Sequence, residues 1–416
     1  MAREEIVAGL DIGTTKISAI IASAGEEERP KIIGVGTTPS VGLRRGVVIN
    51  LEKTVQSIQK AVGEAELMAG VKIGSVYVGI AGDHIRGINS RGVIAVSRGE
   101  GEGNEIAQDD VNRVIEAAKA VAIPMDREII HVLSQEFIVD NQPGIKDPVG
   151  MAGVRLEAEV HIVTGAVTSA QNICESVRRA GIEVEDVVLE PLASSYSVLA
   201  QDEKELGVGL LDVGGGTTDI ALFFEGSIRH TAVIGFGGSN VTRDMAIGLR
   251  TPLEEAEKIK IVHGCALGSL VEEDTMIRVP GVGGRAFREV PRQELCAIIE
   301  PRMEEIFTLA LREIKRTDYA ELMSTGIVLT GGGAIMEGTV ELAERIFDLP
   351  VRRGLPKGVM GLTDKVASPI HATGVGLILY GAVHRSRGGS MIAGARGDRL
   401  FYRILSRMKR WFQEFV

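Results

Sequence analysis

Residues 210–223 read LLDVGGGTTDIALF: an apolar run, an aspartate and three glycines are followed by two threonines and a second apolar run. Three adjacent glycines cost backbone entropy, so they indicate a turn that other residues cannot make or the close approach of a ligand. The segment after them, 219–224, is apolar and β-prone, and Glu225-Gly226-Ser227 then predicts a turn. The glycines therefore join two strands. This excludes the strand-to-helix phosphate loops with the spacings G-x-x-x-x-G-K-[ST] and G-x-G-x-x-G.

A strand–turn–strand unit can still bind phosphate, because successive backbone N–H groups in such a turn form an anion-binding nest. Taken alone, the stretch is equally consistent with a plain tight hairpin. A second stretch, IVAGLDIGTTKISAI at residues 6–20, repeats the pattern of aspartate, apolar residue, glycine, small residues, two threonines, polar residue and isoleucine. Two such hairpins predict a duplicated fold whose halves face one ligand.

A third glycine cluster has a different context. Residues 327–330 (IVLT) are strand-like, three glycines follow, and residues 334–347 (AIMEGTVELAERIF) have helical periodicity. Such a strand–glycine–helix junction lets a flat ring or a phosphate approach the backbone, although its glycines can also be purely structural. Between the second and third clusters, Gly235-Phe236-Gly237-Gly238 opens a helix predicted over 239–249, and residues 252–264 (PLEEAEKIKIVHG) predict a short charged helix.

The composition limits the class of protein. A chain of 416 residues suggests two to four domains, and 44% apolar against 4% aromatic residues is the usual balance of α/β proteins. The net charge of −10 argues against nucleic-acid binding. Cys174, Cys265 and Cys296 show no CxxC pairing, and His84 and His131 have no second ligand at metal spacing, so we expect neither disulfides nor a zinc site. Without a signal peptide or a spanning segment, the body is expected to be soluble and cytoplasmic.

The paired DxGxT hairpins, the later TGGGA and the GFGG-then-helix segment resemble the ATPase superfamily of actin, heat-shock chaperones and sugar kinases, over essentially the whole chain. More narrowly, residues 131–163 (HVLSQEFIVDNQPGIKDPVGMAGVRLEAEVHIV) resemble the FtsA family of bacterial cell-division proteins. This segment predicts strands around a Gly/Pro-rich loop, after a helix at 106–122. Actin-like filament proteins and chaperones have no such insertion there.

The resemblance implies an α/β, actin-like two-lobed ATPase fold of duplicated ribonuclease-H-like cores, with an inserted α/β subdomain and a C-terminal amphipathic helix. The implied parts are a first core lobe (1–84, 164–195 and 364–384), the inserted subdomain (85–163), a second core lobe (196–229 and 303–363), its upper subdomain (230–302), a flexible linker (385–397) and a membrane-targeting helix (398–416).

The resemblance also implies a site for ATP and Mg²⁺. Asp11 and Asp212 would be the metal-side carboxylates, acting through waters because Mg²⁺ sheds water reluctantly. Glu190, at the start of a helix with Pro191 in its first turn, would orient the hydrolytic water; alternatively it is only a helix-starting carboxylate. The residues implied to contact the nucleotide are Gly13, Thr14, Thr15, Lys16, Gly214, Gly215, Gly216, Thr217, Gly237, Gly238, Glu257, Lys260, Gly331, Gly332, Gly333 and Ala334. For Lys16 the alternative is an exposed strand-end lysine, and for Glu257 and Lys260 a surface ion pair.

The C-terminal region has a character of its own. Residues 385–398 (RSRGGSMIAGARGD) have the composition of a flexible linker. On a helix, the apolar residues of the following segment fall within an arc of roughly 140°, and basic residues occupy the opposite side or its edges. A helix docked on the body would explain the apolar stripe, but a helix lying in a membrane surface also explains the basic face and the linker. The predicted membrane-contacting residues are Leu400, Phe401, Ile404, Leu405, Met408, Trp411, Phe412 and Phe415.

As a whole, the resemblance implies a peripheral protein on the cytoplasmic face of the cell membrane at the division septum. It would self-assemble into protofilaments, with 85–163 contributing to self-association, and would tether filaments of the tubulin-like FtsZ through 230–302, together with other divisome proteins. The family is thought to be a slow ATPase or a nucleotide-binding switch, so whether this chain is an enzyme stays open. Two alternatives are a small-molecule kinase of the same superfamily and a pilus-assembly scaffold related to the FtsA family.

Overall fold

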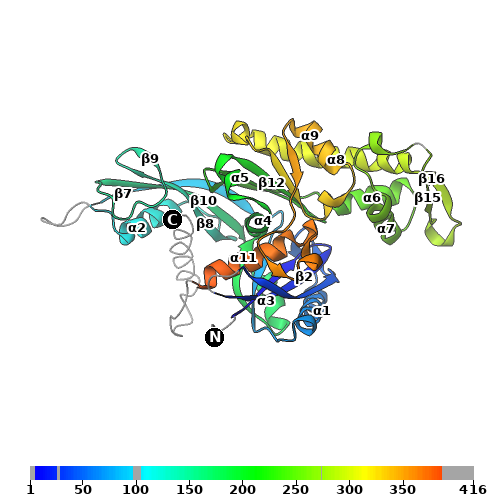
Figure 1. Cartoon of the computed structure of the whole chain (residues 1–416), viewed down its shortest axis with the longest axis horizontal. Helices are drawn as coiled ribbons and strands as arrows, with labels where there is room; N and C mark the ends of the chain where they lie inside the picture. The colour runs from blue at the N-terminus through cyan, green and yellow to red at the C-terminus, as the bar shows by residue number, and fades with distance from the viewer. Residues whose placement is uncertain (1–4, 26–28, 97–104, 273, 387–416) are drawn as a thin grey trace.

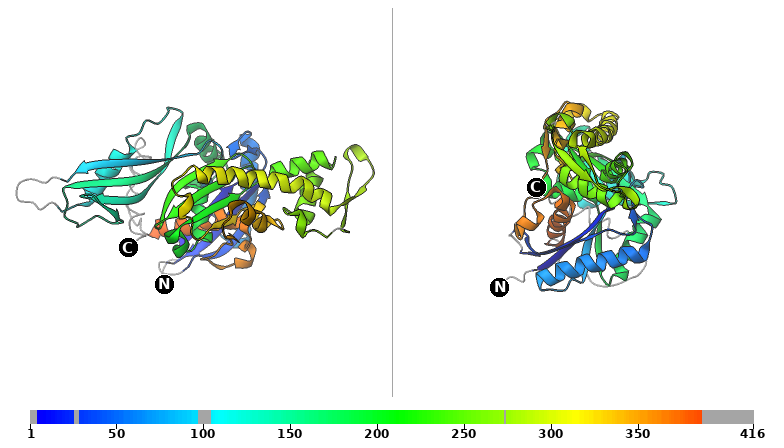
Figure 2. Two further views of the ribbon diagram at one scale, coloured as in Figure 1. Left: turned by 90° about the horizontal axis from the view of Figure 1, so that it is seen from above. Right: turned by 90° about the vertical axis from the view of Figure 1, so that its right-hand side faces the viewer.

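The computed structural model describes residues 5–25, 29–96, 105–272 and 274–386. Two lobes occupy the middle of an elongated molecule, and a smaller sheet and a group of helices project at its opposite ends (Figures 1 and 2). The predicted membrane-contacting residues, from Leu400 to Phe415, lie outside the described residues, as does the linker from residue 387 on. Within the described ranges, no helix combines the length and the apolarity needed to cross a membrane.

The first lobe is built on a six-stranded sheet whose inner strands have nearly continuous apolar sequences, as expected for strands covered on both faces. Helices α1 (Leu51–Ala69) and α3 (Val167–Arg179) pack against each other, as do α4 (Glu190–Val198) and α11 (Ala372–Ser386). The strand order is β11 (Glu183–Leu189), β6 (Ser75–Ile80), β1 (Glu5–Ile12), β2 (Lys16–Ala24), β3 (Lys31–Pro39), β19 (Met360–Gly361).

The second lobe repeats this topology. Its strands run in the order β18 (Val351–Arg353), β17 (Ile327–Thr330), β12 (Val208–Val213), β13 (Thr218–Phe224), β14 (Ser227–Ile234). In each lobe three neighbouring strands are parallel and two antiparallel strands follow, so β12–β13 corresponds to β1–β2. The duplication predicted from the two similar hairpins is confirmed.

The second lobe extends away from its sheet through a group of helices. Helix α6 (Gly238–Gly248) packs against α7 (Leu253–His263), and both precede the hairpin of β15 (Met276–Val279) and β16 (Arg288–Pro291). The long helix α8 (Arg292–Lys315) returns from this hairpin to the lobe and packs against α9 (Thr339–Phe347). The helices predicted over 239–249 and within 252–264 are confirmed.

In its described residues, the inserted segment forms a separate four-stranded sheet, and helix α2 (Gln108–Lys119) packs on it. The predicted strands around a Gly/Pro-rich loop are present, and the predicted helix at 106–122 is shorter at both ends. The strand order is β7 (Arg86–Ala95), β10 (Arg155–Ala166), β8 (Arg127–Val139), β9 (Gln142–Ile145).

Hydrogen bonds between buried polar groups link this inserted sheet to β14 of the second lobe. The His161 ring is hydrogen-bonded to Asn89 Oδ1 (2.6 Å) and Thr231 Oγ1 (2.8 Å), and Gln135 Nε2 donates to Ile228 O (2.9 Å). Burial lowers the pKa of His161 to about 3, so its ring is neutral at physiological pH. The inserted sheet is covalently continuous with the first lobe but packs on the second, so it bridges both.

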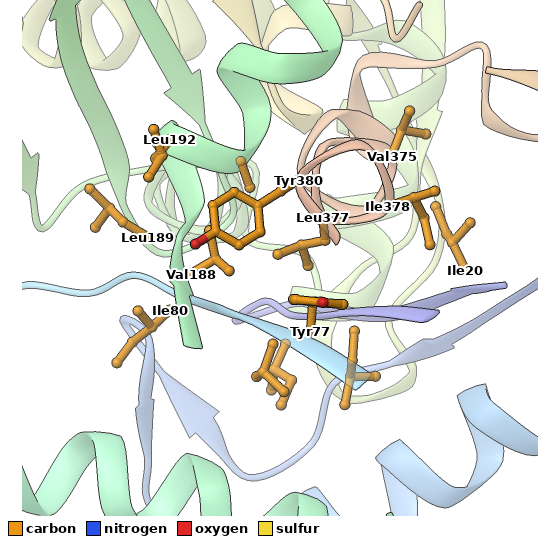
Figure 3. Packing of buried hydrophobic residues seen from close by; sticks show 14 of the residues in the cluster. Ile20, Tyr77, Ile80, Val188, Leu189, Leu192, Val375, Leu377, Ile378 and Tyr380 are labelled. Atoms are coloured by element: carbon orange, nitrogen blue, oxygen red, sulfur yellow. The ribbon is translucent and has the colours of Figure 1, made fainter. Parts of the chain in front are cut away.

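Helix α11 closes the core of the first lobe (Figure 3). Its Leu377 and Ile378 are fully buried, and burial of such side chains stabilises the fold by roughly 1.5–3 kcal/mol each. The Tyr380 ring meets that of Tyr77 edge-to-face with centroids 6.0 Å apart, and the Tyr380 hydroxyl donates to Asp186 Oδ2 (3.2 Å). These contacts fix the helix whose first turn enters the site described below.

The predicted helix over 334–347 is only partly correct. A single 3₁₀ turn, Gly332–Ile335, follows β17, and the α-helix α9 begins at Thr339. Gly338 has a φ of 73°, which a right-handed helix cannot include, so it interrupts the helical periodicity. The remaining elements are β4 (Leu43–Arg44), β5 (Val47–Val48), α5 (Gln201–Leu206), α10 (Thr363–Val366) and the 3₁₀ turns Gly268–Leu270, Val282–Gly284, Ala320–Leu322 and Pro369–His371.

Candidate functional site

The two predicted hairpins end in the same turn. We call residues 13–16 the first Gly-Thr turn and residues 214–217 the second. The Gly13 N–H donates to Lys16 O, and the Gly214 N–H donates to Thr217 O, each at 2.9 Å. Asp11 and Asp212 occupy equivalent positions in the strands that lead into these turns.

The two turns interlock. A methyl group added at Gly215 would lie 2.5 Å from Thr15 Cγ2, and one added at Gly216 would lie 2.6 Å from Thr14 Oγ1. A side chain at either position would have to displace a threonine of the other lobe, so glycine fits here because these threonines occupy the space. The glycines that the resemblance implies for phosphate binding therefore lie where the two lobes meet.

Four carboxylates converge behind the turns. Asp11, Asp212 and Asp219 are each less than 10% exposed, and Glu190 is partly buried at the start of α4. Burial, partly offset by Lys16, raises the pKa of Asp11. Burial also raises the pKa of Asp212 to about 6, against hydrogen bonds that stabilise its charged form.

The pKa values of Asp219 and Glu190 are also raised. Burial and the neighbouring charge of Asp212 raise the pKa of Asp219 to about 8. Thr217 Oγ1 donates to Asp219 Oδ2 (3.1 Å), whereas the buried Oδ1 of Asp219 has no hydrogen-bond partner. Burial, followed by the charges of Asp11, Asp219 and Asp212, raises the pKa of Glu190 well above its usual value. Functional sites typically contain buried carboxylates whose ionised forms are stabilised by few hydrogen bonds or positive charges.

Lys16 is the cation within this cluster. Its Nζ lies 3.7 Å from Asp11 Oδ2 and donates to Ile370 O (2.5 Å). Burial lowers its pKa, and the charges of Asp11 and Asp212 oppose that shift. Its side chain is only 20% exposed, so the alternative interpretation as an exposed strand-end lysine is wrong.

Asp219, Ser194 and Thr373 belong to the cluster but were missed by sequence reasoning. Ser194 Oγ and Thr373 Oγ1 donate to Asp212 Oδ2 at 3.1 and 3.4 Å. Asp219 had a sequence signal, because it is a charged residue in an otherwise apolar strand. The serine and the threonine had none, because α4 and α11 bring them from distant parts of the chain.

The other glycine clusters pack against the second Gly-Thr turn. The N–H groups of Gly238 and Ser239 donate to Gly214 O (2.9 Å) and Gly215 O (2.8 Å), which holds the start of α6 on the turn. A methyl group at Gly331 would lie 2.3 Å from Asp212 Oδ1, and one at Gly333 would lie 2.4 Å from Val213 Cγ1. Gly332 is exposed with free space around it, and Ala334 is buried.

The predicted pair of Glu257 and Lys260 is an ion pair, with Lys260 Nζ 2.7 Å from Glu257 Oε2. It is not an ordinary surface pair, because the lysine side chain is 12% exposed and also donates to Gly238 O (3.1 Å) and Thr242 Oγ1 (2.8 Å). The hydrogen bonds of this pair therefore connect α7 to the start of α6.

No metal ligand set is present among the described residues: no three His, Cys, Asp or Glu side chains lie close enough to hold an ion directly. His131 is a core histidine whose Nε2 accepts a hydrogen bond from the Leu189 N–H (2.9 Å).

Comparisons with known proteins agree with this architecture. The family model "Cell division protein FtsA" matches residues 209–376, and "SHS2 domain inserted in FTSA" matches residues 82–164. The solved PilM-PilN type IV pilus biogenesis complex is similar with a TM-score of 0.65 at 16% identity, covering 90% of this chain and 98% of that one. MreB5 of Spiroplasma citri bound to ADP has a TM-score of 0.55 at 13% identity, covering 92% and 99%. These two likenesses establish the actin-like fold.

A sequence relative identifies the family. The cell division protein FtsA of Pseudomonas aeruginosa is 52% identical over 412 residues, which cover 98% of both chains. This identity far exceeds the 16% shared with the pilus-assembly structure. The chain therefore belongs to the FtsA family of bacterial cell-division proteins.

Proposed function

We propose that this chain binds ATP with Mg²⁺ between its lobes, self-assembles on the inner face of the cell membrane at the division septum, and tethers FtsZ filaments there. The observation that carries the nucleotide site is the cluster of three buried aspartates and the partly buried Glu190 behind two interlocked Gly-Thr turns. If all were ionised, one lysine would face four negative charges. A divalent cation would compensate that excess, and backbone N–H groups in the turns suit phosphate oxygens.

Each side chain then has a role. Asp11 and Asp212 would hold the water shell of the metal, while Ser194 and Thr373 orient the Asp212 carboxylate. The metal would neutralise charge on the phosphates. Glu190, whose pKa is raised well above its usual value, would accept a proton from the attacking water or orient it. This chemistry is compatible with slow hydrolysis or with nucleotide sensing alone.

Two projecting parts of the molecule suit the proposed assembly partners. The inserted sheet and the α6–α7 region lie at opposite ends, so neither obstructs the other (Figure 2). On the α6–α7 region, four large apolar side chains are exposed, which is typical of protein-binding surfaces: Ile247, Leu253, Ile261 and Val262. We assign FtsZ docking to this region and self-association to the inserted sheet.

Membrane attachment would come from the C-terminal segment. Each basic residue there would contribute about 1 kcal/mol near anionic lipid, and the apolar residues add to this. One such anchor binds reversibly, whereas many along a filament raise avidity by roughly 10²–10⁴. Nucleotide-dependent assembly would therefore control attachment.

The nucleotide site is tested by Asp212→Ala. Removing a carboxylate that faces the metal should weaken Mg·ATP binding by about 10- to 100-fold, the usual range for losing a charge-assisted contact. Isothermal titration calorimetry measures this, with the exposed Asp318→Ala as the matched control. Wild-type affinity in the Asp212 variant would remove this residue from the metal environment.

The tether is tested by electron microscopy on lipid monolayers, with and without ATP and FtsZ. We expect the full chain to form ATP-dependent filaments and to recruit FtsZ, and we expect deletion of residues 398–416 to abolish lipid binding while nucleotide affinity stays unchanged. Unchanged lipid binding after the deletion would disprove the anchor. Phosphate transfer to a small metabolite without lipid binding would favour a kinase instead.

A further inference from the structure

A two-residue turn next to the site carries an unusual residue. Strands β4 and β5 pair Leu43 with Val48 and Arg44 with Val47, so Arg45 and Gly46 form the turn. Their φ angles are 50° and 75°, the left-handed values that a type I′ hairpin turn requires. Asn, Asp or Gly normally occupies the first of these positions, because other side chains are strained there. The arginine is therefore not explained by the turn itself.

A similar turn in the second lobe shows how such strain is offset. Glu225 and Gly226 join β13 to β14 with φ angles of 52° and 72°. The Glu225 carboxylate has an internal partner, because Arg229 Nη2 donates to it at 2.5 Å. In the described part of the chain, by contrast, the Arg45 guanidinium has no hydrogen bond and no ion pair.

The Arg45 turn is held rigidly against the nucleotide site. The Gly46 N–H donates to Thr14 Oγ1 (3.1 Å), and Thr14 is the threonine that packs on Gly216. On the other side of the turn, a methyl group at Gly46 would lie 2.4 Å from Ala81 O, so the turn packs closely against the end of β6. The backbone that carries the Arg45 side chain is therefore held in place from both sides.

Its side chain reaches across to the second lobe. A methyl group at Gly235 would lie 3.7 Å from Arg45 Nη1 and 3.9 Å from Arg45 Cδ. The guanidinium thus lies along the backbone at the end of β14, between the lobes, and Arg45 is exposed to solvent.

The contacts along the second Gly-Thr turn show where Arg45 lies relative to the proposed phosphate site. The start of α6 contacts Gly214 O, and the third glycine cluster packs on Asp212 and Val213. Gly216 lies at the other end of the turn, against Thr14 and thus beside the Arg45 turn. Arg45 therefore lies where the contact between Gly216 and Thr14 joins the two turns that are proposed to bind the phosphates.

We propose that Arg45 donates hydrogen bonds to the terminal phosphate of a bound nucleoside triphosphate and makes the protein distinguish ATP from ADP. A guanidinium is suited to this because its planar donors match two phosphate oxygens. The proposal rests on the nucleotide site proposed above and adds a residue that lies outside the glycine, threonine and carboxylate set. The strain of the turn is retained because the cation is needed at this place.

The test compares Mg·ATP and Mg·ADP affinities, measured by titration calorimetry, for the full chain and three variants. Arg45→Asn removes the cation while placing a preferred residue in the turn, so the thermal midpoint should not fall. We expect this variant to bind ATP roughly 10-fold or more weakly and ADP within about twofold of the wild type. Arg45→Lys should retain part of the discrimination. The matched control, Arg44→Asn in the adjacent exposed position, should change neither affinity.

The outcomes separate the two proposals. An unchanged ratio of ATP to ADP affinity in Arg45→Asn, whether both affinities stay constant or both fall equally, would overturn the role of Arg45 while leaving the nucleotide site in place. A wild-type chain that binds neither nucleotide would overturn the nucleotide site itself, and with it the role of Arg45.

Discussion

Replacing Asp219 with asparagine is expected to stabilise the ligand-free protein and to weaken its binding of Mg·ATP. In the folded protein this carboxyl is 3% exposed, and its Oδ1 lacks a partner. Asparagine has nearly the same shape, and its side-chain oxygen can still accept the hydrogen bond from Thr217. The substitution removes a group whose charged form is disfavoured by burial, and it removes the ability of this side chain to ionise beside the proposed metal.

The stabilisation should depend on pH. The pKa of Asp219 is about 8 in the folded protein and about 3.8 without the fold, so the unfolded chain loses this proton first. Between these values the wild type becomes less stable, relative to the variant, as the pH rises, by at most about 1.4 kcal/mol per pH unit. Allowing for relaxation of the site and for a new unpaired amide, we expect a net gain of about 2 kcal/mol at pH 8 and little gain at pH 5.

Thermal unfolding at pH 5 and pH 8 and calorimetry with Mg·ATP measure the two effects. The exposed Asp318→Asn is the control and should change neither quantity. A variant less stable than the wild type at pH 8 would show that the Asp219 charge is compensated within the protein. Unchanged Mg·ATP affinity would place the residue outside the metal environment.

A second large effect is expected from alanine at Gly331 but not at its neighbour Gly332. Gly331 has a φ of 81°, which costs other residues roughly 1–2 kcal/mol. A methyl group there would also lie 2.3 Å from Asp212 Oδ1 and 2.7 Å from Val213 O, so the strand end would have to move, at a further cost of about 1–3 kcal/mol. Gly332 has free space around it, and alanine there should change stability by less than about 0.5 kcal/mol.

Chemical denaturation of both variants gives the difference in the free energy of unfolding. Because the Gly331 substitution would displace Asp212, it should also weaken Mg·ATP binding by at least about 10-fold. Equal stability of the two variants would mean that the third glycine cluster tolerates a side chain facing Asp212. The close approach of the two segments would then not be needed for the site.

Much of the site follows from local sequence patterns. The two Gly-Thr turns were predicted because each needs its glycines and its flanking apolar strands within one short stretch, and such local constraints are visible in the sequence. The third cluster was placed correctly after β17, but the following helix was extended too far, because Gly338 keeps helical spacing while adopting a left-handed φ.

Other parts of the site have no local signature. Ser194 and Thr373 touch Asp212 only because α4 and α11 pack together on the first lobe, and neither residue has a pattern around it. From the sequence alone, Arg45 is only one of two adjacent arginines that would be expected on the surface. Its place between the lobes depends on a hydrogen bond to Thr14 and on the approach of Gly235 from the second lobe.

The sequence by itself determined the duplicated α/β architecture and the positions of the two Gly-Thr turns, because strand periodicity and glycine turns are encoded by neighbouring residues. Only the tertiary structure decided that the glycines interlock with threonines of the other lobe, that Asp11, Asp212 and Asp219 are buried near one another and near Glu190, and that the inserted sheet packs on β14. The reason is physical: burial, and with it the shifts in carboxyl pKa, arises between segments that are far apart in the chain.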